Sequence, residues 1–544
     1  MRIIRRAHRI ASATLPRMRR SLRLTALGIT ALALSASCLA QAPQDLTVDA
    51  AHIVGPHTQT PLNTVGAGRA NEGLRADWQA QLSTVQREIG FHYIRFHGIF
   101  HDDMGVYTED SPGNPIYNFQ YIDALYDALL ARHIRPFVEL SFMPAALASG
   151  TQTGFWWKCN ITPPKDMAKW NALVQAFITH LQSRYGADEV NHWYFEVWNE
   201  PDLPHQVFFT GSQADYFNLY KNTAESIRSV CPHCRVGGPA SAIADGWQED
   251  WLNFIAKNNA PADFLSAHTY GATESAVVPA GPLGTSLDPS PDSIVGDVRG
   301  SRDRIDHSDT PNLELHYTEW SSSYTPTDYI HDQYIEAAFI LEKLRATSPL
   351  AQSMSYWTFT DIFEEGGPPT RPFHGGFGLI NLQGIRKPAY FAYKFLAQLG
   401  PNDIATTDAT HSWATTKPTG AVQVLFWNYT PIVPPADSDD QLFYNHEQPA
   451  QPAPSTHLTI DHVINGVYQL NVYRTGYERN DAFTAYLHMG SPANLSRAQV
   501  EALNQFTNGA PTESRIVTIT NNQFNQTFPM HQNDTVLVIL TPTH

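Results

Sequence analysis

The stretch "YFEVWNEPDLP" (residues 194–204) decides the fold, because it is a strand that ends abruptly at a carboxylate. The residues from Tyr194 to Trp198 are mostly aromatic or β-branched, as strands favour. Pro201 cannot donate a ladder hydrogen bond, so Glu200 is placed at the carboxyl end of the strand. An acid in that position, next to an amide, belongs either to an ordinary solvated turn or to a reactive site, and the rest of the chain decides between the two.

Around this stretch, strand-like runs alternate with helical patterns. The eight runs are residues 64–69, 93–98, 134–142, 193–200, 235–241, 264–270, 313–320 and 353–361. Helical stretches with apolar residues at i, i+3, i+4 and i+7 include residues 121–133, 170–186, 215–229 and 334–346. Eight such alternations predict an α/β fold, a (β/α)₈ TIM barrel over residues 64–398. A doubly wound open sheet is the alternative, but no Gly-rich phosphate loop follows the first strand.

The pattern changes after the barrel, where short runs alternate apolar and polar residues as antiparallel strands do. These runs are residues 421–430, 455–464, 467–475, 514–522 and 534–542. They predict an accessory β-sandwich domain over residues 399–544. Residues 41–63 are expected to join this sandwich, with 46–54 as an edge strand. One helix is expected near residues 496–504, opened by a capping box of Ser496 and Gln499.

The first 40 residues have the features of a signal peptide. Arginines precede the apolar run "LTALGITALALSA" (24–36), and small residues follow it. Cleavage after Ala40 would place Cys38 and Ala40 at the −3 and −1 positions. The run is too short for a good membrane span. We therefore expect an exported protein, periplasmic or secreted, and "RRSLRL" (19–24) leaves both the Sec and the twin-arginine routes open.

The composition of the chain indicates which kinds of molecule it could bind. The net charge of −16 disfavours nucleic acid, and 42% apolar with 16% charged residues is typical of a soluble globular protein. Cys231 and Cys234 could form a disulfide after export or remain two free thiols. A zinc site would need a second pair of ligands, which the sequence does not offer. We expect no metal and no cofactor.

Polar side chains recur where the predicted barrel strands end, and reactive groups gather at that end of such barrels. They are His97, Asn199, Glu200, His268, Tyr270, Glu319, Asp361, Glu364 and Glu365. Each alone has an ordinary structural explanation, but their coincidence indicates one site. Glycosidic cleavage with retention needs two carboxyl groups about 5–5.5 Å apart, which Glu200 and Glu319 could supply. Asn199 could hold the sugar 2-hydroxyl.

The chain resembles glycoside hydrolase family 39, which includes β-xylosidases and α-L-iduronidases, over roughly residues 46–540. The similar motifs are "VGAGRANEGL" (65–74), "RFHGIFHDDMGVY" (95–107), "ELSFMPAALASG" (139–150), "FEVWNEPDL" (195–203), "SAHTY" (266–270), "HYTEWSSSY" (316–324), "YWTFTDIFEEGG" (356–367) and "HGGFGLIN" (374–381). "NEP" alone is shared with related barrel families, whereas the ordered set of eight is specific.

This resemblance implies that Glu200 is the acid/base and Glu319 the nucleophile of a retaining glycosidase. The residues implied to line the first sugar subsite are His97, Asn199, His268, Tyr270, Glu364 and Glu365. Arg95 shares a strand face with His97 and could hold Glu319 ionised. Glu196, one level below Glu200, is expected to be paired and structural. Trp357 could be a sugar platform or a core residue.

Substrate preference is indicated by Tyr270. An iduronidase needs a basic group near the sixth strand to bind a carboxylate, and Tyr270 is uncharged. The resemblance therefore favours a neutral pentoside, with β-xylosides first and β-glucosides, β-galactosides and α-L-arabinosides open. A non-catalytic carbohydrate-binding protein is the alternative of another class; it would have lost a carboxylate, whereas both are present.

Overall fold

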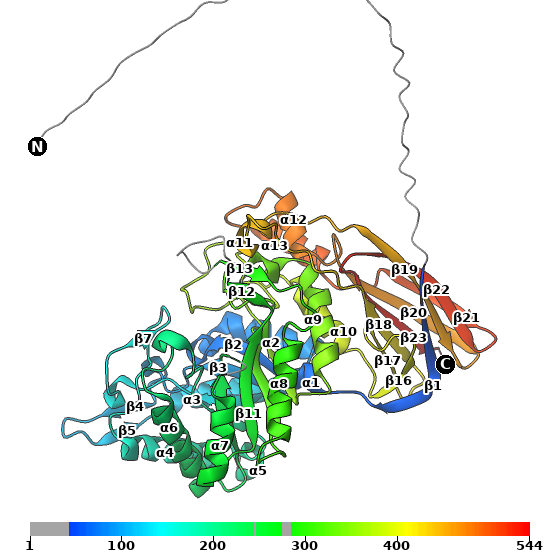
Figure 1. The fold of residues 1–544 in the computed structure, drawn as a ribbon. Coiled ribbons are helices and arrows are strands. Elements are labelled where there is room, and N and C mark those ends of the chain that lie inside the picture. Colours follow the sequence, from blue (N-terminus) through cyan, green and yellow to red (C-terminus); the bar gives the residue numbers. More distant parts are fainter. Residues whose placement is uncertain (1–42, 244–245, 275–283, 544) are drawn as a thin grey trace, which may run out of the picture. The chain divides into compact units, whose positions relative to one another are not determined.

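The computed structural model describes residues 43–243, 246–274 and 284–543 (Figure 1). The predicted signal peptide, with Cys38 and the cleavage site after Ala40, lies outside the described residues. Among those described, no helix combines the length and the apolar character needed to cross a membrane.

Eight parallel strands close into a barrel, which confirms the predicted (β/α)₈ fold. In order around the barrel they are β2 (Thr64–Arg69), β3 (Tyr93–His97), β6 (Arg135–Leu140), β9 (Tyr194–Val197), β10 (Arg235–Ser241), β11 (Phe264–Tyr270), β14 (Glu314–Ser321) and β15 (Ser353–Tyr356). The fourth and eighth strands end earlier than predicted. At the end of β9 the reason is local, since Trp198 (φ 74°) and Glu200 (φ 44°) adopt left-handed backbone conformations that no strand can continue.

A helix follows each barrel strand. The main helices are α2 (Ala76–Glu88), α3 (Gln120–Leu130), α4 (Met167–Tyr185), α6 (Gln213–Val230), α7 (Gln248–Asn258), α8 (Val295–Asp306), α9 (Ile335–Thr347) and α10 (Pro388–Leu396). Their starts follow local chemistry: the Asp166 side chain accepts from two backbone N–H groups of α4, and Ser212 opens α6 with a capping box. Their buried faces pack on the barrel, as Trp170 and Phe177 of α4 do.

Shorter elements lie in the connections. They are α1 (Thr60–Asn63), η1 (Ala70–Leu74), η2 (Asp102–Met104), β4 (Tyr107–Glu109), β5 (Pro115–Tyr117), η3 (Ala145–Leu147), β7 (Thr153–Gly154), β8 (Cys159–Asn160), α5 (Ala187–Val190), η4 (Pro204–Gln206), β12 (Ala272–Glu274), β13 (Thr285–Leu287), η5 (Tyr329–Asp332), α11 (Asp440–Phe443) and α12 (Ala482–His488). Cys231 and Cys234 form a disulfide directly after α6, while Cys159 is a buried free thiol.

Nine strands form the second sheet, in the order β21-β20-β23-β18-β17-β16-β1-β19-β22. They are β1 (Gln44–Pro56), β16 (Asn402–Thr406), β17 (Ser412–Thr416), β18 (Val422–Trp427), β19 (Pro452–Asp461), β20 (Gly466–Thr475), β21 (Glu513–Ile519), β22 (Gln523–His531) and β23 (Thr535–Pro542). The rings of Phe426 and Phe528 lie 5.6 Å apart although β18 and β22 are distant in this order, so the sheet folds over one apolar core.

One expectation for this sheet was wrong. β1 is an interior strand, because it pairs antiparallel with β16 on one side and parallel with β19 on the other, and is not an edge strand. The predicted helix is α13 (Arg497–Phe506), and its capping box of Ser496 and Gln499 is present.

The sandwich packs directly on the barrel. Trp427 Nε1 donates to Glu342 Oε2 of the barrel at 2.8 Å, and its ring belongs to the barrel core. A loop of the sandwich also reaches the barrel loops, where the Gln441 side chain accepts from the Thr285 backbone N–H at 3.0 Å. Residues of the sandwich therefore contact the loops that follow the barrel strands, at the same end of the barrel as the predicted site.

Candidate active site

Glu200 occupies a strained turn just beyond β9. Its left-handed backbone conformation is uncommon for a residue with a side chain and is maintained by its surroundings. The Glu200 backbone N–H donates to the Ala240 carbonyl of β10 at 3.0 Å, and the Asp202 carboxylate accepts from the Ala242 N–H at 2.8 Å. The neighbouring strand thus fixes the turn, which leaves the Glu200 side chain 12% exposed at the end of the barrel.

Glu319 lies on β14 and is held from both sides. One carboxylate oxygen accepts from Arg95 Nη1 and the other from the Tyr270 hydroxyl, each at 2.7 Å. Arg95 is completely buried, so this ion pair is shielded from water. Glu319 is therefore fixed as an oriented carboxylate, with 7% of its side chain exposed.

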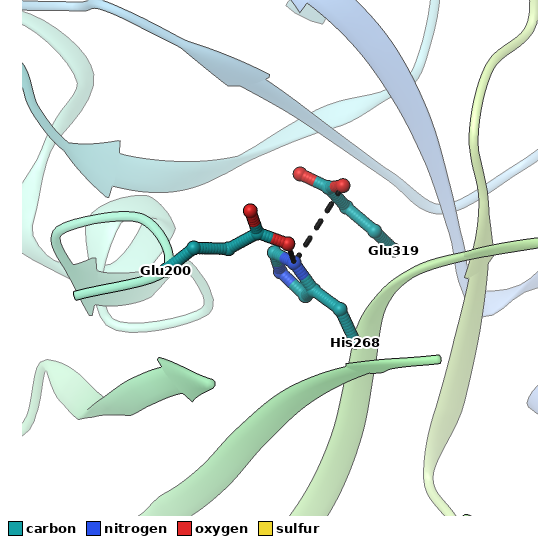
Figure 2. Close-up of side chains that lie close together, drawn as sticks. All are labelled: Glu200, His268 and Glu319. Atoms are coloured by element: carbon teal, nitrogen blue, oxygen red, sulfur yellow. Dashed lines mark hydrogen bonds and ion pairs between the residues drawn. The ribbon is translucent and has the colours of Figure 1, made fainter. Parts of the chain in front are cut away.

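The two carboxyl groups come together around His268 (Figure 2). His268 Nδ1 lies 2.7 Å from Glu200 Oε1 and 3.6 Å from Glu319 Oε2. One oxygen of each carboxyl group lies within 4.8 Å of the other. This separation fits the spacing of about 5–5.5 Å used for retention and is shorter than the ~6.5–9.5 Å used for inversion.

Within the described part of the chain, these three side chains also place ligand atoms close enough to one another to hold a metal ion. Both oxygens of Glu319 already accept hydrogen bonds, and His268 Nδ1 already pairs with Glu200. Their contacts are accounted for without a cation, and we assign none.

Both carboxyl groups are mostly buried, and their different partners separate the chemistry of Glu200 from that of Glu319. Desolvation raises the pKa of Glu200 to about 7, although the nearby positive charges of His97 and Arg95 act against this. Glu200 can therefore be protonated at a pH where ordinary carboxyl groups are ionised. Glu319, paired with Arg95, is the ionised partner that a nucleophile must be.

A buried set of carboxyl contacts surrounds Arg95. Arg95 contacts Glu196 Oε2 at 2.6 Å, Asn199 Oδ1 at 2.8 Å and Glu139 Oε2 at 2.8 Å, besides Glu319. Burial opposes its charge, but the carboxylates outweigh that effect and raise the pKa of Arg95. The expected pairing of Glu196 is present. The role of Glu139 was missed, because a single acid in the apolar strand "RPFVEL" gives little signal.

His97 carries the second positive charge of the site. Its Nδ1 lies 2.7 Å from Glu139 Oε2, and its Nε2 lies 3.3 Å from Glu365 Oε1. Burial disfavours the protonated ring, but Glu139 and the other carboxylates outweigh it and raise the pKa of His97 to about 10. The Phe155 and Trp357 rings pack against it, with centroids 5.4 and 4.8 Å away.

The two glutamates after β15 have different surroundings. Glu365 contacts His97, and burial raises its pKa. Glu364 instead accepts from Arg69, the last residue of β2, at 2.9 Å and from Arg75, in the connection that follows, at 3.1 Å. The geometry favours Glu365 as a sugar contact, while the same prediction for Glu364 has no contact here that supports it.

Trp357 forms part of the inner wall of the site. Only 2% of it is exposed, and its ring lies so close to Gly66 that any side chain at position 66 would overlap it.

Glu72 is a second residue that the sequence analysis did not predict. Its buried carboxyl group accepts from the backbone N–H groups of Arg69 and Glu364. Desolvation raises the pKa of Glu72 to about 8. These contacts hold the Glu364 segment against the first barrel loop.

The sequence of this chain is similar to those of known glycoside hydrolases. Residues 44–522 match the model of glycosyl hydrolases family 39. The chain is 42% identical to a β-xylosidase from Geobacillus stearothermophilus over 370 residues, which is 67% of this chain and 73% of the relative. It is 39% identical to a β-xylosidase from Caldicellulosiruptor saccharolyticus over 456 residues, which is 81% of this chain and 86% of the relative.

A solved structure shows the same arrangement of strands and helices. The crystal structure of the GH39 enzyme from Xanthomonas axonopodis pv. citri matches with a TM-score of 0.89 and 45% sequence identity. The match covers 94% of this chain and 100% of the other.

Proposed function

The chain belongs to glycosyl hydrolases family 39, and from this we propose that it is a retaining exo-β-xylosidase. Membership makes it an enzyme that hydrolyses glycosidic bonds. Its substrates are β-xylosides such as xylo-oligosaccharides. The enzyme therefore acts in the degradation of xylan. It works by double displacement.

In the first displacement Glu319 attacks the anomeric carbon and Glu200 protonates the departing oxygen. The C–O bond breaks with its electron pair on that oxygen, and an ester forms between the sugar and Glu319. Arg95 and Tyr270 hold Glu319 in position, and Asn199 and Glu365 bind the sugar hydroxyls. The raised pKa of Glu200 keeps its proton available for this step.

In the second displacement the roles of Glu200 reverse. Now ionised, it takes a proton from water, and the water oxygen attacks the anomeric carbon of the ester. Glu319 leaves as a carboxylate and returns to its contact with Arg95. Two inversions give net retention.

The observation that carries this proposal is the close pair of carboxyl groups in unlike surroundings. Glu200 and Glu319 lie within 4.8 Å, one desolvated and hydrogen-bonded to His268, the other paired with Arg95. Such a pair of carboxyl groups is not needed in a protein that binds sugars without cleaving them. Proteins that bind sugars without cleaving them require only aromatic and polar contacts.

The preference for a neutral sugar rests on charge. Arg95 and His97, the cations nearest the two carboxyl groups, are already paired with carboxylates. Tyr270 uses its hydroxyl on Glu319 and carries no charge. These groups leave little to stabilise the carboxylate of a uronide. The two relatives named β-xylosidase support a xyloside as the neutral sugar.

A panel of nitrophenyl glycosides tests the substrate. We expect the β-xyloside to be cleaved far better than the β-glucoside, β-galactoside, α-L-arabinoside and α-L-iduronide. Preference for the iduronide would contradict the neutral-sugar argument, and preference for another neutral glycoside would correct the substrate alone. No turnover of any member would favour the carbohydrate-binding alternative. The variant Glu319→Ala serves as the blank.

The proposal also includes export. The basic, apolar and small residues that precede Gln41 support a signal peptide removed after Ala40. N-terminal sequencing of active protein from its native host should begin at or near Gln41. An intact terminus at Met1 or Met18 would contradict export by this signal.

A further inference from the structure

His268 is the hydrogen-bond partner of Glu200 among the described side chains (Figure 2). It is fully buried on β11, with Nδ1 2.7 Å from Glu200 Oε1 and Nε2 3.2 Å from Thr318 Oγ1. A neutral imidazole has one ring proton, so one nitrogen donates and the other accepts. The groups beyond Nε2 decide which nitrogen carries the proton.

Behind Nε2 the hydrogen-bond directions are fixed by Glu196. Its Oε2 accepts from the guanidinium of Arg95 at 2.6 Å, and the two completely buried side chains form an ion pair. Its Oε1 lies 2.9 Å from Thr318 Oγ1, and an ionised carboxylate can only accept. Thr318 therefore gives its one hydroxyl proton to Glu196. The Thr318 oxygen can then only accept from His268, so Nε2 of His268 is the donor.

We propose that Thr318 is a positioning residue that locks His268 in its Nε2–H tautomer, so that Nδ1 can only accept and Glu200 must enter the reaction as the hydrogen-bond donor. Desolvation, the largest influence on this ring, lowers the pKa of His268 to about 4 and keeps it neutral. The inference rests on the proposed role of Glu200 as acid/base.

An irregularity of β14 makes this contact possible. His268 pairs with Glu319, but Ala267 pairs with Tyr317, so Thr318 has no residue opposite it in the ladder. Neighbouring residues of a regular strand point to opposite faces. At this bulge both Thr318 and Glu319 reach the barrel interior, where one contacts His268 and the other contacts Arg95.

The lock acts in both displacements. When Glu200 gives its proton to the leaving oxygen, its carboxylate faces the Nδ1 lone pair of His268 with no proton between them. Two acceptors at this distance repel, and the repulsion raises the affinity of Glu200 for the proton of the incoming water. Relief by turning the Thr318 hydroxyl towards His268 would leave Glu196 Oε1 buried without a donor, which is costly.

Other ionisable groups face Glu200 from the surrounding elements. They are Arg95, His97, Glu139, Asp202, Tyr270, Glu319 and Glu365. All of them remain in place when Thr318 alone is changed. A difference between two variants at position 318 therefore reports the hydroxyl group and not the general electrostatics of the site.

The test compares Thr318→Val with Thr318→Ser. Valine keeps the shape but loses the hydroxyl, which frees His268 to take the Nδ1–H form and donate to ionised Glu200. We expect the high-pH limb of kcat/KM for xylobiose to move to lower pH by about one unit in Thr318→Val, since a donor to the charged form lowers a carboxyl pKa. Thr318→Ser should keep the wild-type midpoint. An unchanged midpoint in folded Thr318→Val, or equal shifts in both variants, would overturn the proposal.

Neutron diffraction from the wild-type enzyme gives a second test that needs no variant. At a pH below the high-pH limb we expect deuterium on His268 Nε2, on Thr318 Oγ1 towards Glu196, and on Glu200. Deuterium on His268 Nδ1 would refute the lock even if xylosides are cleaved as proposed. A different substrate preference would instead correct the proposed function and leave the deuterium positions as a separate result.

Discussion

Replacing Glu200 by alanine should separate the two displacements. With a pKa of about 7, Glu200 is roughly nine-tenths protonated one pH unit below that value, so wild-type enzyme uses its acid fully there. General acid catalysis contributes ~10²–10⁴ in rate. For xylobiose, whose leaving group is a poor one, kcat/KM of Glu200→Ala should fall by about that factor.

Activated aryl xylosides should respond differently. Their phenols depart with little protonation, so kcat/KM should change by less than about tenfold. Hydrolysis of the ester on Glu319 then lacks its base, and kcat should fall ~10²–10⁴-fold while KM falls with it. Stopped-flow absorbance should show a burst of phenol equal to the enzyme concentration, because the ester accumulates.

Azide supplies the decisive measurement. A small anion can enter the space left by the Glu200 side chain beside His268 and attack the ester without a base. Azide should therefore restore kcat on aryl xylosides, and NMR should identify the product as the β-xylosyl azide. The matched control is Glu314→Ala, which removes a carboxylate from the opposite end of β14 and should show neither azide rescue nor leaving-group dependence. Equal losses on xylobiose and aryl xylosides in Glu200→Ala, or an inverted product from wild type, would refute the assignment.

Three further outcomes follow from the same contacts. Glu319→Ala should lose activity on aryl xylosides and xylobiose alike, without azide rescue at the retained configuration, and a leaving-group-dependent loss would contradict its role. The kcat/KM of wild-type enzyme should fall as pH rises through about 7, because the protonated form of Glu200 is the active one; a high-pH limb near the pKa of tyrosine would contradict this. Lys387→Met should lower the free energy of unfolding by about 3–5 kcal/mol in urea titrations, since it strands the buried carboxylates of Asp332 and Asp361, and a loss below about 1 kcal/mol would contradict the pairing.

The barrel was predictable because its strands are buried runs with clear ends. All eight predicted strands are present, and each of them starts within one residue of the prediction. The ends of β9 and β15 were overestimated. At β9 the reason is the left-handed turn of Trp198 and Glu200, which strand propensity does not reveal. The position of β1 was wrong because a single sequence shows an alternating strand but not how many neighbours it has.

The site residues, too, were predicted only where the sequence pattern shows their position. Residues at strand ends were predicted from their position, and Glu200, His268 and Glu319 do lie together (Figure 2). Glu139 and Thr318 were not predicted, because they lie within strands and act on other side chains. For Thr318 the period of two even points the wrong way, since a regular strand would turn it away from Glu319. Only the register of β11 against β14 reveals it.

The interior position of β1 has a consequence for synthesis. Its partners β16 and β19 leave the ribosome only after the whole barrel has been translated, a delay of roughly 20–70 s at ~5–20 residues per second. Throughout that interval a strand of 13 residues has both hydrogen-bonding edges open. Nascent or truncated chains that stop within the barrel should therefore be the ones that recruit chaperones or aggregate, whereas in the completed chain both edges of β1 are paired.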